Sequence, residues 1–303
     1  LLKGDREKAK TEDNVAYITV DLQQTMPLPR LSTSKAFYLR QLWLYNLGIH
    51  IVTKDAETTT FCVWTEDQAS RGSKEVTSAL LTALEHEDIL KNIDHIVIWS
   101  DSCAGQNKNF LMICLYQYMI HKGLFKVIEH KFPEVGHTYL DSDRDFGRIE
   151  KNLRKHQNIY SPDEYRDIIA KSSKKNKVVN MRDHFRETQD LSTTLKLYNR
   201  KSDVVKNPVK FRDMVKWIRV DEYGSYLFKP CYDENTPFMK VDICKSRKQS
   251  QSLQGPVTIP RTIRAFGQLK KEKIDNIKEQ LKYIPDHHRW WYHQIINQYE
   301  AQP

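Results

Sequence analysis

Two aspartates stand directly after runs of apolar and β-branched residues. Asp21 follows the run from Val15 to Val20, and Asp101 follows the run from His95 to Ser100. Such runs are typical of buried strands, so each aspartate is expected at a strand end. If the strands are neighbours, carboxylates about 4 Å apart repel by roughly 4 kcal/mol at an effective dielectric constant near 20. A bound cation relieves that repulsion, so we predict that Asp21 and Asp101 are catalytic residues that hold Mg²⁺ or Mn²⁺, with two ions expected.

A third carboxylate is expected from an acidic helix later in the chain. The segment 137–150 offers four acids, of which Asp143 and Glu150 lie seven residues apart and share a helix face. Both border the apolar stripe that would meet the sheet. Asp141 and Asp145 are expected to point sideways and to complement the helix dipole. We therefore predict Asp143 as the third metal ligand, with Glu150 as the alternative and both as candidate catalytic residues.

Polar residues near these acids are candidates for contacts to nucleic acid. Gln23 and Gln24 come just after the first acid, and Asn107 and Lys108 lie in a small-residue turn that leads into a predicted helix. Amides, backbone N–H groups and lysines of this kind can bind phosphate, although ordinary loop polarity explains them as well. His137 precedes the acidic helix and is a candidate catalytic residue that touches the scissile phosphate or assists product departure. The alternative is a loop histidine bonded to backbone.

The positive charge of the chain is unevenly distributed. Residues 1–160 contain 20 basic and 21 acidic residues, whereas residues 161–303 contain 28 basic and 18 acidic residues. A basic flank beside a neutral domain is what a phosphate-backbone binder needs, and a solvated charged surface is the alternative. Within the basic half, we expect nucleic-acid contacts from Lys174, Lys175 and Lys177 in the polar run 171–177.

The periodicity of the sequence predicts an α/β fold. Over residues 1–160 we expect three strands, then a helix, a strand, a helix, a strand and a helix. This is the element order of the RNase H-like fold, a five-stranded mixed sheet with helices on both faces. The predicted strands cover 15–21, 41–52, 58–65, 95–101 and 125–132, and the predicted helices cover 73–87, 107–121 and 141–156.

The rest of the chain is expected to form smaller units. We predict an RNase H-like catalytic core over residues 1–160, a basic α+β extension over 161–245, a linker over 246–266 and a C-terminal helical segment over 267–303. Ser161 and Pro162 are a good helix start, and Pro285 should break the amphipathic helix that begins near Lys271.

Composition excludes several classes of protein. The five cysteines form no CxxC pair, so neither a zinc site nor a disulfide framework is expected. No run of about 18 apolar residues is present, so we expect a soluble, intracellular protein without a membrane partner. Because residue 1 is Leu, we also expect that the chain is a fragment whose upstream region is missing.

Several blocks of the sequence resemble a large group of uncharacterised animal proteins thought to derive from DNA transposons, with an RNase H-like, DDE/D transposase or integrase-type catalytic domain. The resemblance spans about Asp21 to Tyr292. It implies polynucleotidyl transfer by Asp21, Asp101 and an acid of the last helix, with DNA as partner and RNA left open, a nuclear location and possible homo-oligomers. The matching blocks are Asp21-Leu-Gln-Gln with Pro27-Leu-Pro, Ser100 to Asn109, Gly136-His-Thr, Asp143-Arg-Asp-Phe with Glu150, and Leu281 to Pro285.

The leading hypothesis is therefore a DDE/D transposase-like enzyme that uses a divalent metal to cut and join DNA strands. An RNase H-like nuclease that hydrolyses DNA or RNA without strand transfer would use the same acids. A domesticated, non-catalytic nucleic-acid-binding protein is the alternative from a different class.

The position of the third ligand is testable. At 1.5 Å per residue, Glu150 lies about 10 Å further along the helix axis than Asp143. We expect Asp143→Asn to abolish metal-dependent cleavage and Glu150→Gln to leave a measurable fraction, with both variants folded by circular dichroism. The reverse result would make Glu150 the ligand, and full activity in both variants would remove the three-acid site.

Overall fold

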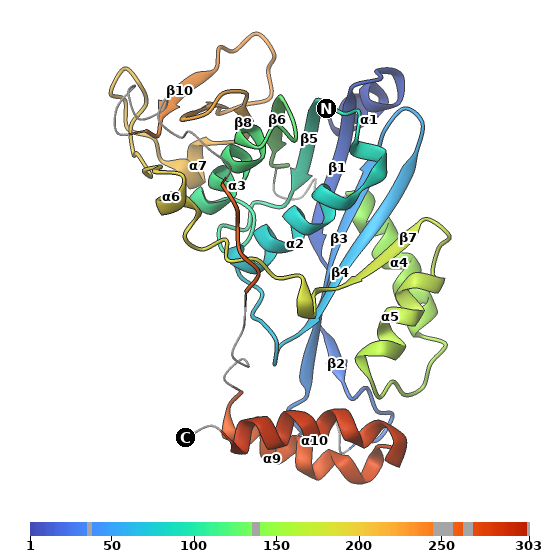
Figure 1. Ribbon diagram of the computed structural model, residues 1–303. Helices are drawn as coiled ribbons and strands as arrows, with labels where there is room; N and C mark the ends of the chain where they lie inside the picture. Colours follow the sequence, from blue (N-terminus) through green and yellow to red (C-terminus); the bar gives the residue numbers. More distant parts are fainter. Residues whose placement is uncertain (35–37, 135–139, 245–256, 263–268, 302–303) are drawn as a thin grey trace.

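A single mixed sheet forms the centre of the protein (Figure 1). The computed structural model describes residues 1–34, 38–134, 140–244, 257–262 and 269–301. In this part of the chain, ten strands form one sheet in the order β10-β9-β8-β6-β5-β1-β3-β4-β7, with β2 paired to β3. The strands are β1 Val15–Leu22, β2 Met26–Leu28, β3 Leu42–Val52, β4 Glu57–Thr65, β5 His95–Ser100, β6 Val127–Lys131, β7 Asn176–Asn180, β8 Trp217–Val220, β9 Ser225–Lys229 and β10 Met239–Asp242.

Helices flank both faces of this sheet. One hydrophobic cluster joins the sheet to α2 and α3, and other clusters join it to α1, to α4 and α5, and to the C-terminal pair α9 and α10. None of the described helices is long and apolar enough to cross a membrane. The helices are α1 Leu2–Thr11, α2 Ser73–His86, α3 Phe110–His121, α4 Asp141–Leu153, α5 Pro162–Lys171, α6 Leu191–Thr194, α7 Phe211–Met214, α9 Lys271–Gln280 and α10 Asp286–Glu300.

The centre of the sheet has the predicted elements in the predicted order. β1 is antiparallel to β3, β3 is antiparallel to β4, β1 is parallel to β5, and β5 is parallel to β6. Helices α2 and α3 follow β4 and β5, and α4 follows β6. The short elements α1 and β2 were not predicted. The protein is thus mixed α/β, with a large mixed sheet flanked by helices.

The predicted number of five strands is wrong, because the second half of the chain extends both edges of the central sheet. β7 pairs in parallel with β4, and β8 pairs antiparallel with β6. Three strands of the predicted α+β extension, β8, β9 and β10, continue the central sheet. The division of the chain at residue 160 stays a prediction, and most of the predicted linker 246–266 lies outside the described residues.

The sequence predicted most helix ends to within a few residues of where the structure has them. Ser161 caps α5 as predicted, since its hydroxyl accepts the N–H of Glu164. Ser73, where the predicted helix 73–87 begins, is the first residue of α2. Glu75 accepts the N–H of the preceding Gly72 at 3.0 Å. Helix α3 begins at Phe110, three residues later than predicted, because Asn109 caps it through the N–H of Met112.

Gly48 lets α4 approach the sheet closely. In the sheet register, Gly48 of β3 lies between Asp21 of β1 and Phe61 of β4. The ring of Phe146 from α4 packs over this position, 6.2 Å from the ring of Phe61 between centroids. A Cβ atom on Gly48 would stand 2.8 Å from the Phe146 ring. The absence of a side chain at Gly48 therefore sets how near α4 comes to the end of β1.

We expect Gly48→Ala to lower the free energy of unfolding by about 1–3 kcal/mol, because overpacking displaces Phe146. Gly147→Ala is the matched control, since Gly147 is the next residue of α4 and its Cβ would meet nothing within 4 Å. The control should stabilise the helix by roughly 0.5–1 kcal/mol. Urea denaturation measures both, and equal stability of the Gly48 variant and the wild type would contradict the close approach.

Candidate active site

Asp21 and Asp101 are brought together by parallel pairing of β1 and β5. Val20 is the register partner of Ser100, so the two aspartates are the next residues along two adjacent strands. Asp21 is the last-but-one residue of β1, and Asp101 directly follows β5. Both side chains are half-buried. The predicted pairing of strand-end aspartates is therefore present in the fold.

The environment of Asp21 disfavours its charge. Burial raises the pKa of Asp21 to about 7, with further contributions from the negative charges of Asp101 and Asp143. The N–H of Leu22 donates to Asp21 Oδ1 at 2.8 Å and opposes the shift. Three carboxylates from β1, the β5 end and α4 thus lie within electrostatic range of one another.

Asp101 is held by the turn that follows it. Asn107 Nδ2 donates to Asp101 Oδ1 at 2.6 Å, and the N–H of Cys103 donates to the same atom at 3.2 Å. Asn107 is buried, so its amide orients Asp101 and does not face a ligand. The prediction that Asn107 contacts nucleic acid is not supported by this position.

The Lys108 side chain also makes its contacts inside the protein. Its ammonium donates to the carbonyl of Arg212 at 2.7 Å and lies 5.2 Å from the centre of the Phe132 ring. Only 6% of the residue is exposed, and burial lowers the pKa of its ammonium. Lys108 therefore joins the turn to α7, and its contact to phosphate stays a prediction.

Helix α4 begins at the acids and is fastened there by side chains. Asp143 Oδ2 accepts the N–H of Leu140 at 2.6 Å, which closes the first turn. Asp145 is buried and accepts from Thr59 at 2.9 Å, with His50 Nδ1 2.6 Å from the same oxygen. Asp145 was predicted only to complement the helix dipole, but it anchors α4 to β3 and β4.

Asp141 was expected to play the same helix-dipole role. It pairs instead with Arg6 of α1 at 3.2 Å and with Arg144 at 2.8 Å. Its position therefore joins α4 to the N-terminal helix.

Glu150 lies in a different setting from Asp143. It accepts from Gln23 Nε2 at 2.8 Å, and Gln23 Oε1 in turn accepts from Asn46 Nδ2 at 2.8 Å. Burial is the main reason why the pKa values of Tyr165 and Asp21 are raised; the charge of Glu150 contributes at Tyr165, whereas the charge of Asp143 contributes at Asp21. Gln23 is therefore a buried link between β1, β3 and α4, and the arrangement favours Asp143 as partner of the two strand-end acids.

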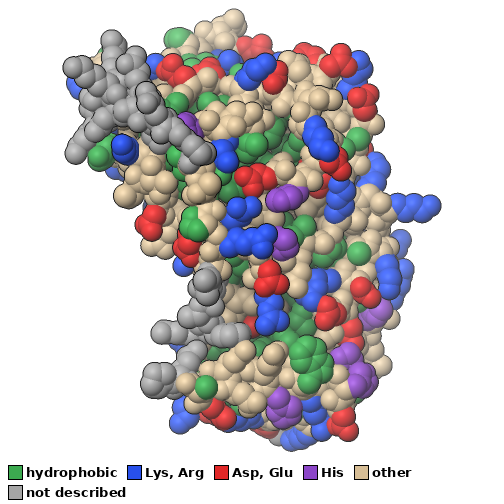
Figure 2. Space-filling model, in the orientation of Figure 1, with side chains coloured by type: hydrophobic (Ala, Val, Ile, Leu, Met, Phe, Trp, Pro, Cys, Tyr) green, Lys and Arg blue, Asp and Glu red, His purple; other side chains and the backbone are tan. Residues whose placement is uncertain are grey.

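The remaining predicted site residues are spread out. Gln24 is exposed just beyond β1, and His137 lies outside the described residues. Lys175 pairs with Glu57 at 3.0 Å and Lys177 with Glu87 at 2.6 Å, so these lysines are partly neutralised. Lys174 is exposed at the turn before β7. On the face drawn in Figure 2, Lys and Arg side chains are interspersed with Asp and Glu and form no continuous stripe.

Sequence analysis missed a buried hydrogen-bond chain behind Asp101. Ser100 Oγ donates to the carbonyl of Asp101 at 3.0 Å, so the hydroxyl must accept from His130 Nε2, which lies 2.8 Å away. His130 Nδ1 then accepts from the Tyr116 hydroxyl at 2.8 Å. Burial lowers the pKa of His130 to about 3, so the ring stays neutral and the chain keeps this direction. These residues sit inside apolar runs, where only their polarity is a signal.

The three carboxylates do not form a finished ligand set. In the described part of the chain, no three His, Cys, Asp or Glu side chains are close enough to hold a metal ion. The donor chemistry nevertheless suits a hard divalent cation. Burial, and after it the negative charges of Asp101 and Asp143, raise the pKa of Asp21, and a cation would remove the repulsion between the carboxylates. The bond from the Leu140 N–H occupies Oδ2 of Asp143 and leaves its Oδ1 atom for an ion.

The fold and this acidic strand end define a mixed α/β domain with a carboxylate cluster. The chain belongs to the family described as "Domain of unknown function (DUF7869)", which matches residues 42–218. None of the curated proteins compared with the chain matches it in sequence.

Two solved structures are similar to parts of the chain. One, described as "Crystal structure of NurA with manganese", shares 11% identity over 75% of this chain and 45% of its own, with a TM-score of 0.18. The other, "Crystal structure of NurA", shares 10% identity over 98% of this chain and 58% of its own, also with a TM-score of 0.18. The chain thus spans about half the length of these structures, and scores this low carry no argument about fold or function.

The raised pKa of Asp21 predicts a pH-dependent stability. Its folded pKa of about 7 exceeds the ordinary value of 3.8, so its contribution is favourable at low pH and is lost as pH rises from about 4 to 7. Asp21→Asn should therefore match the wild type in stability near pH 4 and exceed it near pH 8, by on the order of a few kcal/mol. Thermal unfolding in metal-free buffer measures this. A difference that does not change between pH 4 and pH 8 would contradict the charge cluster.

Proposed function

We propose that this protein is a DDE/D transposase-like polynucleotidyl transferase, built on an RNase H-like core, that cuts and joins DNA strands with a divalent metal. The observation that carries the proposal is that three carboxylates from separate elements lie within electrostatic range of one another. Asp21 and Asp101 end adjacent parallel strands, and Asp143 at the start of α4 lies near enough to raise the pKa of Asp21. The strand order β4-β3-β1-β5-β6, with only β3 antiparallel to the other four, supports the RNase H-like core.

Asp21, Asp101 and Asp143 would hold Mg²⁺ or Mn²⁺. Such ions, when bound, neutralise the carboxylates and act as Lewis acids on a phosphodiester. The protein contributes orientation. Asn107 fixes the Asp101 carboxylate, and the chain from His130 through Ser100 fixes the Asp101 carbonyl. A carboxylate that is already oriented loses less conformational freedom when it binds an ion.

Metal binding by the three carboxylates would need a side-chain adjustment, because among the described residues no three such groups are close enough to hold an ion. A rotation of Asp143 could break the bond by which its Oδ2 atom accepts the N–H of Leu140 and caps the first turn of α4. Loss of one such cap costs about 1 kcal/mol, which is small beside the repulsion that a cation relieves. The capping bond is thus compatible with a role in metal binding.

The proposal is tested by metal binding and by reaction products together. Wild-type protein should gain thermal stability with Mn²⁺, by about 2.7 kcal/mol when the ion is present at 100 times its dissociation constant. With labelled DNA ends it should give nicked and joined strands. Asp101→Asn should lose the metal-induced shift and the products. Asp55→Asn is the matched control, because Asp55 is an exposed aspartate in the turn between β3 and β4.

The products separate this proposal from its rivals. Nicked strands without joined strands would identify a nuclease instead of a transferase. Binding of DNA without any product, with the same metal response in the wild type and Asp101→Asn, would contradict the proposal and favour a non-catalytic binding protein.

A further inference from the structure

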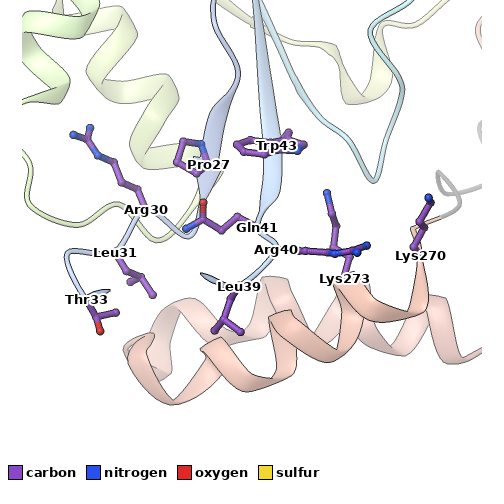
Figure 3. Close-up of a pocket in the computed structure, with 10 residues that line it drawn as sticks. All are labelled: Pro27, Arg30, Leu31, Thr33, Leu39, Arg40, Gln41, Trp43, Lys270 and Lys273. Carbon is purple, nitrogen blue, oxygen red and sulfur yellow. The ribbon is translucent and has the colours of Figure 1, made fainter. Parts of the chain in front are cut away.

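A basic pocket lies between the end of the β2–β3 pair and the C-terminal helix α9. The cavity has a volume of about 800 Å³ and opens to the surface (Figure 3). It is built from residues more than 220 positions apart in the chain. Its lining residues are Pro27, Arg30, Leu31, Thr33, Leu39, Arg40, Gln41, Trp43, Lys270 and Lys273.

The pocket carries an excess of positive charge. Four of the lining residues are cationic and none of the ten is acidic. Lys273 pairs with Glu66. Arg40 lies 3.7 Å from Glu272, and the side chains of Arg40 and Glu272 are both exposed. Figure 3 shows Arg40 and Lys273 side by side with Lys270 beyond them. The pocket is therefore suited to an anionic ligand.

The backbones of Arg40 and Arg30 are held in place by hydrogen bonds to other elements. Arg40 donates its N–H to Asn276 Oδ1 at 2.7 Å, and its carbonyl accepts from Gln280 Nε2 at 3.0 Å. Gln280 is buried in α9, so these bonds fasten the segment before β3 to the helix. Arg30 forms a backbone bridge with Ile159.

The Arg30 side chain is anchored as well. Its Nη1 atom donates to the carbonyl of Leu153 at the end of α4, at 3.0 Å. The Arg30 side chain and the Arg40 backbone are thus fixed, which favours a specific site over a diffuse charged surface.

The pocket also has a planar aromatic wall. Trp43 is half-buried in β3, opposite Pro27 of β2, and the Lys273 ammonium lies 5.8 Å from the centre of its ring. Leu31 and Leu39 add apolar surface. A ligand with both phosphates and planar rings fits this lining best. The bases of a single strand are available to stack on an aromatic ring, whereas those of a duplex are already stacked on one another.

The pocket lies further along β3 from the level of the carboxylates. Trp43 precedes Gly48, the register partner of Asp21, by five residues on β3. At about 3.4 Å per residue, the two levels are ~17 Å apart along the strand. Because this spacing is odd, Trp43 packs on the face of the sheet that carries α2 and α3, whereas Gly48 faces Phe146 of α4, so a nucleic-acid strand bound at both sites has to pass from one face to the other.

We propose that this pocket binds one nucleotide of a single nucleic-acid strand and so anchors the strand whose phosphodiester lies at Asp21 and Asp101. Binding of a nucleotide in the pocket does not depend on the proposed function. Anchoring of the strand at Asp21 and Asp101 does rest on it. Arg40 and Lys270 bind the phosphate, and Trp43 contacts the base.

Binding without cleavage tests the pocket separately from catalysis. A fluorescent oligothymidylate of about 15 nucleotides is titrated with protein in EDTA, and anisotropy is followed over a range of salt concentrations. Arg40→Ala with Lys270→Ala should weaken binding at least tenfold at low salt and reduce the salt slope by about 0.7 per lost phosphate contact. Trp43→Phe should weaken binding less, with a slope like that of the wild type, because it changes stacking and no charge. The wild type should bind a duplex of the same length more weakly than the single strand.

Lys271→Ala is the matched control, since Lys271 is the first residue of α9 and is exposed, but does not line the pocket. It should bind within twofold of the wild type. Equal losses from Lys270→Ala and Lys271→Ala would show surface charge only and overturn the proposal, as would wild-type binding by the Arg40 and Lys270 double variant. If polyglutamate displaced the labelled strand as well as unlabelled oligothymidylate does, the pocket would bind anions in general, and the proposal would also be overturned. If the double variant loses binding while no protein yields cleavage products, the proposed function fails and the pocket stands.

Discussion

The approach of α4 to the sheet over Gly48 is the contact on which the candidate site depends. Without a side chain at Gly48, the Phe146 ring rests on the strand directly beside the level of Asp21. That packing sets the depth of the whole helix, and the first turn carries Asp143. Burial of Asp21, together with the negative charges of Asp101 and Asp143, then raises the pKa of Asp21. An apolar contact thus contributes to the electrostatic repulsion among the carboxylates of the candidate site.

Buried polar residues hold the acids in this arrangement. Asn107 orients Asp101, Gln23 joins Glu150 to β3, and Asp145 ties α4 to His50. Each is satisfied by hydrogen bonds in a region where an unpaired polar group would be costly. Their conformations are therefore strongly determined. A site that holds three like charges near one another needs such a frame, because the charges themselves push the elements apart.

The second half of the chain belongs to the same structure as the first. β7 and β8 to β10 extend the two edges of the central sheet, and α9 and α10 pack on the far ends of β2 and β3. Some of the positive charges of this half form ion pairs, and others line a pocket. Lys175, Lys177 and Lys273 pair with acids of the first half, and Lys270 and Lys273 line a pocket with arginines that come from before β3. The charge asymmetry along the sequence is therefore a poor guide to the charged surfaces of the folded protein.

The sequence by itself determined the central strands, the main helices and the positions of the strand-end acids Asp21 and Asp101. Those features depend on local physics: β-branched apolar runs, the 3.6-residue period and caps such as Ser161. It did not determine that β7 pairs with β4, that Lys108 is buried, or that Ser100 and His130 support Asp101. Each of these depends on which distant segments meet, and a polar residue carries the same local signal whether it faces a partner or water. Only the tertiary structure decided between Asp143 and Glu150 as the neighbour of Asp21, because both lie on one helix face and the packing of Phe146 on Gly48 sets the height of that helix.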